Sequence, residues 1–158
     1  MATPRKIPAG LVVLDASFLI DVVRRSKDVE RFVPVLKRAE VTSVNFGEVL
    51  YKLGRTSTVK QSVIENALVT TGLTVVDVGL PTVRRFLELK NIDAKSTTVQ
   101  ERSGSGPAKT LSLGDLICLG YAMERERPVL TGDRHWTTLG RHGLTVPVFD
   151  YRDPDTGI

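Results

Sequence analysis

Short aliphatic runs alternate with longer segments of helical spacing along most of this chain. The run at 11–14 contains no polar residue, which is typical of a central parallel strand that is covered on both faces. Further strands are predicted at 40–43, 73–78, 128–130 and 144–149, and helices at 17–25, 31–39, 45–54, 57–71, 80–91, 112–125 and 135–140. The alternation predicts an α/β fold with a mostly parallel central sheet and helices on both faces.

The connection from 94 to 110 is predicted to be irregular. It contains the low-complexity segment SGSGP at 103–107 and the basic residues Lys95, Arg102 and Lys109. A connection of this length is unusual in a compact domain, so we expect a basic rim that lies outside the core.

Composition limits the cellular setting. The 158 residues, 41% of them apolar, suffice for one globular domain at 11–149, with an N-terminal extension at 1–10 and a polar C-terminal tail at 150–158. The net charge of +4 is compatible with a polyanionic partner and equally with ordinary solubility. A single cysteine excludes a disulfide framework, and the charged N-terminal run is too short for a signal peptide or membrane span. We therefore expect a cytoplasmic protein.

Four carboxylates stand at the edges of apolar segments: Asp15, Glu48, Asp115 and Asp133. Asp15 and Asp133 directly follow predicted strands, and open α/β sheets build their sites at the carboxyl ends of strands. Two such charges about 5 Å apart repel by roughly 3 kcal/mol at an effective dielectric constant of about 20. A cluster of four therefore calls for shared protons or a divalent cation, and oxygen ligands suit Mg²⁺ or Mn²⁺.

Helix capping is the alternative explanation for each acid taken singly. Ser112 with Asp115, and Asn45 with Glu48, have the spacing of capping pairs. Asp133 could cap the short helix after it, and Asp15 could close a turn. Capping alone leaves a charged group beside a buried strand and beside an apolar helix face unexplained. Both uses can coexist, because one carboxylate oxygen can accept from the backbone while the other faces an ion.

Other chemistries fit less well. His135 and His142 have no zinc-site spacing and are predicted to lie at the surface. Ser17 lacks the G-x-S-x-G context of a hydrolase nucleophile, and the chain has no phosphate-binding glycine loop. A phosphatase that uses Asp15 as its nucleophile would carry a second aspartate where Ser17 stands.

Several further residues are candidates for weaker contacts with a substrate. Thr131 could position Asp133 through its hydroxyl, although a strand threonine is more often only a β-former. Arg134, Lys109 and Arg102 could contact phosphates, each with ordinary surface charge as the alternative. Trp136 could stack on a base or could simply pack in the core.

The four acidic segments resemble, in order, those of the PIN-domain ribonucleases and in particular the VapC-type toxins. LDASFLID is similar to the opening strand with its first aspartate, VNFGEVLYKL to the glutamate segment, LSLGDLICLGYA to the helix with the third acid, and TGDRHW to the T-x-D-R motif. The connection before LSLGD is longer than usual for that family. The resemblance implies a three-layer PIN-like sandwich and a Mg²⁺-dependent endoribonuclease.

That resemblance also implies a biological setting. It predicts the toxin of a type II toxin–antitoxin system, which cleaves RNA, forms a homodimer and is blocked by a cognate antitoxin. Asp15 and Asp115 would be the main metal ligands, with Glu48 and Asp133 completing the site. A housekeeping PIN nuclease that processes RNA or DNA, or a non-catalytic PIN scaffold that binds RNA or protein, remain alternatives.

Overall fold

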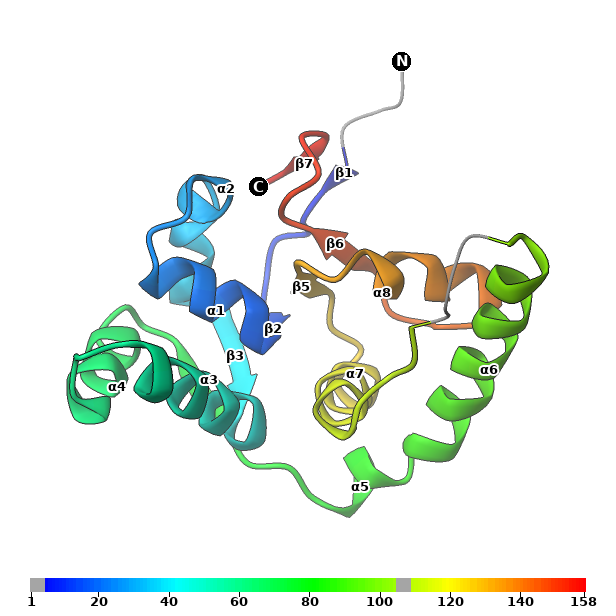
Figure 1. The fold of residues 1–158 in the computed structure, drawn as a ribbon, viewed down its shortest axis with the longest axis horizontal. Coiled ribbons are helices and arrows are strands. Elements are labelled where there is room, and N and C mark those ends of the chain that lie inside the picture. The colour runs from blue at the N-terminus through cyan, green and yellow to red at the C-terminus, as the bar shows by residue number, and fades with distance from the viewer. Residues whose placement is uncertain (1–4, 105–108) are drawn as a thin grey trace.

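The computed structural model describes residues 5–104 and 109–158. Within these residues a five-stranded sheet has the order β4-β3-β2-β5-β6 with every neighbouring pair parallel, which confirms the predicted parallel sheet (Figure 1). The strands are β2 (Val12–Leu14), β3 (Ala39–Thr42), β4 (Thr74–Val76), β5 (Val129–Thr131) and β6 (Val148–Asp150). The first predicted strand thus lies at the centre of the sheet.

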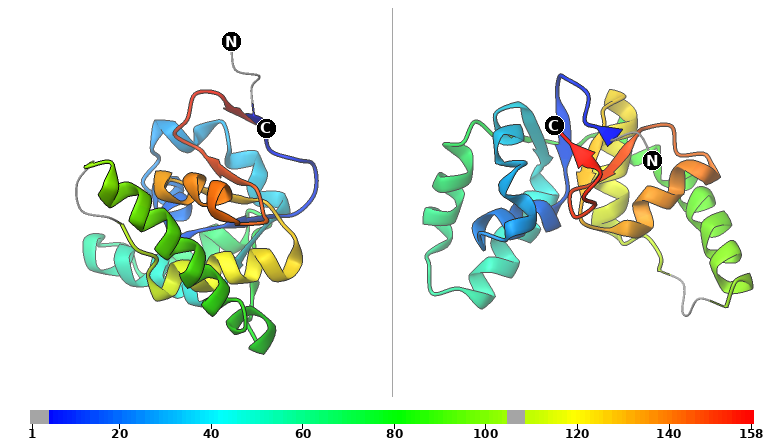
Figure 2. Two further views of the ribbon diagram at one scale, coloured as in Figure 1. Left: turned by 90° about the vertical axis from the view of Figure 1, so that its right-hand side faces the viewer. Right: turned by 90° about the horizontal axis from the view of Figure 1, so that it is seen from above.

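Helices cover both faces of the sheet, as predicted (Figure 2). They are α1 (Ala16–Val23), α2 (Lys27–Glu30), the 3₁₀ helix η1 (Val33–Arg38), α3 (Ser43–Thr56), α4 (Gln61–Val69), α5 (Leu80–Val83), α6 (Phe86–Arg102), α7 (Leu113–Arg125), α8 (Arg134–Thr138) and the 3₁₀ helix η2 (Leu139–His142). No described helix is long and apolar enough to cross a membrane.

Alternation along β2 divides the core into two layers. Val12 and Leu14 point into a cluster with α1, α3 and α4, whereas Val13 points into a cluster with α6, α7 and α8. Successive side chains of a strand face opposite sides, so a fully aliphatic strand can serve both layers. The result is a three-layer α/β/α arrangement.

Helix α6 corrects the predicted irregular connection, because it continues to Arg102. The sequence of its second half is polar and shows no apolar periodicity that would predict a helix. Asp93 and Ser96 are nevertheless buried on its inner side. Asp93 accepts from the Leu111 backbone N–H at 2.8 Å and pairs with His135 Nε2 at 3.0 Å. The His135 side chain is only 8% exposed, so its predicted surface position is wrong. Most of SGSGP, residues 105–107, lies outside the described residues.

Two short strands from the first and last described segments of the chain pair beside the sheet. Strand β1 (Arg5–Lys6) pairs in parallel with β7 (Thr156–Gly157), and Arg5 donates to the Val148 carbonyl at 3.1 Å. Between β6 and β7, Tyr151 is completely buried against Phe18, with the ring centroids 5.2 Å apart. The segment after β6 is thus packed onto the layer that contains α1.

Candidate active site

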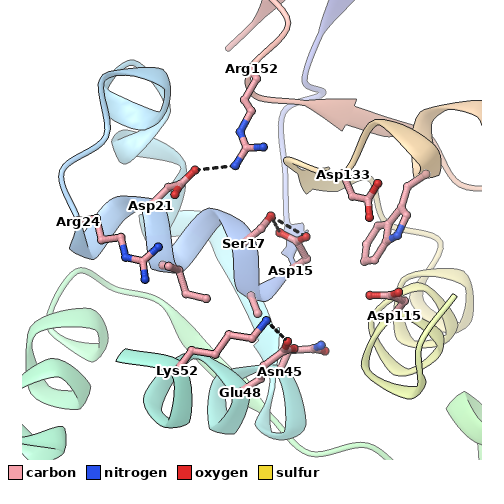
Figure 3. Close-up of a pocket in the computed structure, with 13 residues that line it drawn as sticks. Asp15, Ser17, Asp21, Arg24, Asn45, Glu48, Lys52, Asp115, Asp133 and Arg152 are labelled. Carbon is pink, nitrogen blue, oxygen red and sulfur yellow. Dashed lines mark hydrogen bonds and ion pairs between the residues drawn. The ribbon is translucent and has the colours of Figure 1, made fainter. Parts of the chain in front are cut away.

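A cavity of about 350 Å³ lies where β2, β3 and β5 give way to helices, and its walls include Asp15, Glu48, Asp115 and Asp133 (Figure 3). Asp15 follows β2, Asp133 follows β5, and Glu48 lies on the helix after β3. Asp115 comes from the first turn of α7, which packs against the sheet from the other face. The fold therefore brings all of the predicted acids to one edge of the sheet.

Asp15 is almost fully buried and is held by hydroxyl groups. Ser17 Oγ lies 2.8 Å from both carboxylate oxygens, Thr131 Oγ1 donates to Oδ2 at 2.7 Å, and the Phe18 backbone N–H donates to Oδ1 at 3.2 Å. Burial raises the pKa of Asp15 from 3.8 to about 6, and the charge of Asp115 adds to this, while the hydrogen bonds oppose it. Burial therefore makes this carboxyl easier to protonate than a solvent-exposed aspartate.

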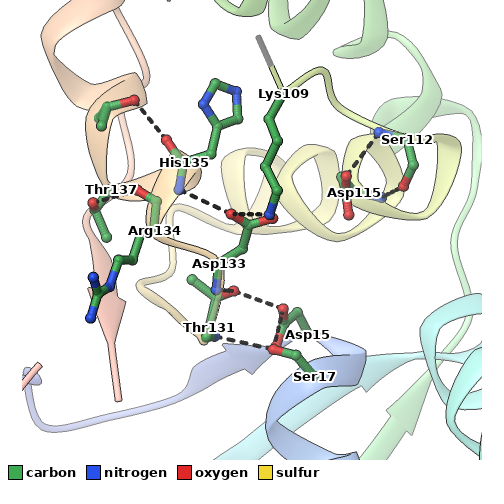
Figure 4. A network of polar contacts seen from close by, with 12 residues as sticks. Asp15, Ser17, Lys109, Ser112, Asp115, Thr131, Asp133, Arg134, His135 and Thr137 are labelled. Atoms are coloured by element: carbon green, nitrogen blue, oxygen red, sulfur yellow. Dashed lines mark hydrogen bonds and ion pairs between the residues drawn. The ribbon is translucent and has the colours of Figure 1, made fainter. Parts of the chain in front are cut away.

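The same hydroxyls connect Asp15 to the loop that carries Asp133 (Figure 4). Thr131 Oγ1 accepts from the Asp133 backbone N–H at 3.0 Å, and Ser17 Oγ accepts from the Gly132 backbone N–H at 3.1 Å. Asp133 in turn caps α8 by accepting from the His135 N–H at 2.9 Å. Two side chains thus fix the relative position of two acids.

Asp115 caps its own helix while facing the other acids. Its Oδ2 accepts from the Ser112 backbone N–H at 2.8 Å, which confirms the predicted capping pair. Burial raises the pKa of Asp115, and the charges of Asp133 and Glu48 raise it further. Capping and mutual repulsion are therefore both present at this residue.

Glu48 lies on the α3 wall, close to the start of α7. A Cβ added at Gly114 would lie 3.4 Å from Glu48 Oε2, and Asn45 Nδ2 donates to the Gly114 carbonyl at 3.0 Å. The predicted cap by Asn45 is wrong, because α3 begins earlier and is capped by Thr42, whose Oγ1 accepts from the Asn45 N–H at 3.1 Å. The Asn45 side chain instead joins the two helices that carry Glu48 and Asp115.

Two lysines neutralise acids of the cavity. Lys52 Nζ lies 2.6 Å from Glu48 Oε1, and Lys109 Nζ lies 3.3 Å from Asp133 Oδ2. In the described part of the chain, no three histidine, cysteine or acidic side chains are arranged to hold one ion. The donors nevertheless suit a hard divalent cation, because four carboxylates line one cavity and their oxygens are the ligands that such ions prefer.

The weaker candidates occupy different positions. Thr131 is completely buried between Asp15 and Asp133. Arg134 is 84% exposed and faces Asp150 at 3.7 Å, and Arg102 is exposed at the end of α6. Trp136 lines the cavity but is 2% exposed and packs in the core, and its Nε1 has no hydrogen-bond partner among the described residues.

Sequence reasoning missed several residues of the cavity wall. None of these residues was predicted to line the site: Ser17, Asp21, Arg24, Asn45, Lys52 and Arg152. From the sequence, Ser17 was considered only as a nucleophile and Asn45 only as a helix cap. Asn45, Glu48 and Lys52 have i, i+3, i+7 spacing, so one face of α3 could have been recognised. No spacing pattern of this kind connects Arg152 with the acids, because Arg152 follows β6 and is separated from all four acids in the sequence.

Comparison with known proteins agrees with this geometry. The family model of the PIN domain matches residues 12–141. The structure is similar to VapBC2 from Rickettsia felis bound to a DNA fragment from its promoter, with a TM-score of 0.63 and 13% identity over 89% of this chain and 98% of that chain. No curated protein sequence matches.

Two further solved structures have the same fold. DNA-bound VapBC from Salmonella typhimurium has a TM-score of 0.57 and 16% identity, over 90% of this chain and 98% of that chain. VapBC-5 from Mycobacterium tuberculosis, a member of the VapBC family of toxin-antitoxin systems, has a TM-score of 0.55 and 20% identity over 90% and 99%. At these identities the likeness concerns the fold.

Proposed function

Because this chain belongs to the PIN-domain family, a family of nucleases, we propose that it is a metal-dependent endoribonuclease and the toxin of a type II toxin–antitoxin system. The observation that carries this proposal is the meeting of Asp15, Glu48, Asp115 and Asp133 around one cavity at the carboxyl edge of the sheet. The fold shared with VapBC systems supports the assignment to a toxin.

Asp15 and Asp115 are the proposed principal ligands of Mg²⁺ or Mn²⁺, with Glu48 and Asp133 completing the set directly or through water. When bound, the ion would neutralise charge that develops on the phosphorus and favour attack by water. Burial raises the pKa of both proposed principal ligands, and neighbouring carboxylates raise it further, so a bound cation would favour their ionised forms.

The chain's own residues prepare this site. Ser17 and Thr131 donate hydroxyls to Asp15, so its carboxylate is held in one orientation before substrate arrives. The capping box does the same for Asp115. The buried Trp136 closes one wall against water, and Lys52 and Lys109 supply positive charge beside the acids.

The proposal includes partners and a setting. We expect a homodimer in the cytoplasm, with RNA as substrate and a cognate antitoxin that blocks the cavity. We also propose that residues 11–149 form the nuclease domain, with 1–10 as an N-terminal extension and 150–158 as a C-terminal tail that packs against it.

The test is cleavage of RNA by the purified full chain. Cleavage should stop in EDTA and return with Mg²⁺ or Mn²⁺, and Asp115→Asn should lower the rate by more than about 100-fold. Asparagine can still cap α7, so circular dichroism should show an unchanged fold. Full-rate cleavage in EDTA, or by a folded Asp115→Asn protein, would falsify the proposed mechanism.

A further inference from the structure

Arg152 reaches the acidic cavity from the segment after β6. Its Nη2 donates to Asp21 Oδ2 at 3.0 Å and to the Tyr151 hydroxyl at 3.2 Å, and its Nη1 donates to the Gly132 carbonyl at 3.3 Å. The guanidinium lines the cavity. Because it is already held in one orientation, it loses little side-chain entropy when it binds an anion.

Gly132 allows this approach. A Cβ at this position would lie 2.5 Å from the Tyr151 hydroxyl and 3.0 Å from Arg152 Cζ, so any other residue would displace the tail. Tyr151 is fully buried, and its hydroxyl donates to Asp21 Oδ2 at 2.7 Å. Because Gly132 has no side chain, the C-terminal tail at 150–158 can pack closely against the loop between Thr131 and Asp133.

Arg24 adds a second guanidinium on the same side. It follows the last residue of α1 and lines the cavity, and its side chain makes no hydrogen bond or ion pair with another described residue. Figure 3 shows Arg24 and Arg152 on either side of Asp21, with Asp133 and Asp115 on the opposite side of the cavity. Two arginines and one aspartate leave this side with a net charge of +1.

The cavity therefore has an acidic side and a basic side. Resting on the proposed function, we propose that Arg24 and Arg152 form a subsite for a backbone phosphate next to the bond that the acidic side cleaves. The Arg24 guanidinium can offer paired N–H donors to phosphate oxygens. Arg152 adds its positive charge and the N–H donors that Asp21, Tyr151 and Gly132 leave unused. A single strand lying across both sides would place one phosphate by the acids and a neighbouring phosphate by the arginines.

The experiment measures binding of single-stranded RNA to the full chain in an Asp115→Asn background that does not cleave. Arg24→Met and Arg152→Met should each weaken binding about threefold to tenfold at low salt. Each should also flatten the slope of log affinity against log salt by about 0.7, from about 50 to about 300 mM. Arg152→Lys should keep most of the slope and lose affinity, because it retains the charge without the contacts to Gly132, Asp21 and Tyr151 that orient the guanidinium.

Arg31→Met is the matched control for damage to the tail. Arg31 donates to the carbonyls of Asp153 at 2.7 Å and Pro154 at 3.2 Å, but it does not line the cavity. Its loss should loosen the tail without changing the salt slope. In the cleaving background, Arg24→Met should raise KM and leave kcat nearly unchanged, as loss of a uniform binding contact does.

Three outcomes overturn the subsite. One is an unchanged salt slope in the Arg24→Met and Arg152→Met proteins while the parent binds RNA and wild type cleaves it. Another is the same loss of slope in Arg31→Met. A third is unaltered RNA binding with weaker neutralisation by the antitoxin, which would assign the arginines to a protein partner. A wild-type chain that neither binds nor cleaves RNA refutes the proposed function itself.

Discussion

Asp15 combines burial with repulsion, and this makes the stability of the metal-free protein depend on pH. Its pKa rises from 3.8 to about 6 in the folded state, so between these values the native protein binds more protons than the unfolded chain. Stability contributed by the protonated carboxyl is complete below about pH 4 and is lost as pH rises through about 6. Two pKa units correspond to about 3 kcal/mol at most.

Replacing Asp15 by Asn should remove this dependence. In EDTA, the free energy of unfolding of the variant minus that of wild type should be larger at pH 7 than at pH 4, by about 2 kcal/mol, because only wild type loses stability as pH rises. Urea titrations of both proteins at the two pH values measure it. A difference that is equal at both pH values would show that Asp15 is not strained by its charge in the folded state.

The positions of single site residues could be predicted where an acidic residue directly follows a predicted strand. Asp15 and Asp133 could be placed because a parallel sheet aligns the ends of its strands. Their shared contacts with Ser17 depend on side-chain rotamers, which no pattern encodes. His135 was misplaced because its burial depends on Asp93, a partner in another helix.

At the scale of elements, α6 supports both segments that follow it. Asp93 binds the Leu111 N–H just before α7 and His135 in α8. Asp93→Ala would leave two buried donors without this acceptor, and we expect a loss of about 2–4 kcal/mol of unfolding free energy. Chemical denaturation measures the loss. Thr98→Ala, at an exposed position of the same helix, should stay within about 0.5 kcal/mol.

An Asp93→Ala protein as stable as wild type would contradict this support by α6.

The second half of α6 could not be predicted, for a physical reason. Residues 94–102 contain serine, two threonines and one valine, which have only moderate helix propensity, and few apolar residues to show periodicity. Local helix propensity is too weak to predict this helix, and the tertiary contacts of the buried Asp93 and Ser96 stabilise it.

Across the whole molecule, the layers of the fold could be predicted, but the pairing of strands from its two ends could not. Strand–helix alternation fixes a parallel sheet with helices on both faces. Pairing of β1 with β7 joins two-residue strands from opposite ends of the chain, too short to leave a pattern. Arg152 reaches the cavity from the segment after β6 through contacts with Asp21 and Gly132, which are distant in sequence, so its place in the site could be found only in three dimensions.

A toxin must act on the whole cell, which gives the last prediction. Expression of the chain in a bacterial host should stop growth, because the proposed RNA cleavage would halt protein synthesis, and co-expression of the proposed cognate antitoxin should restore growth. Asp15→Asn and Asp115→Asn, expressed to the same level, should leave growth normal, since each removes a proposed metal ligand. Colony counts after induction, with immunoblots for protein level, measure the effect. Arrest by the inactive variants would trace toxicity to binding, and harmless expression of a chain that cleaves RNA in vitro would favour a processing nuclease.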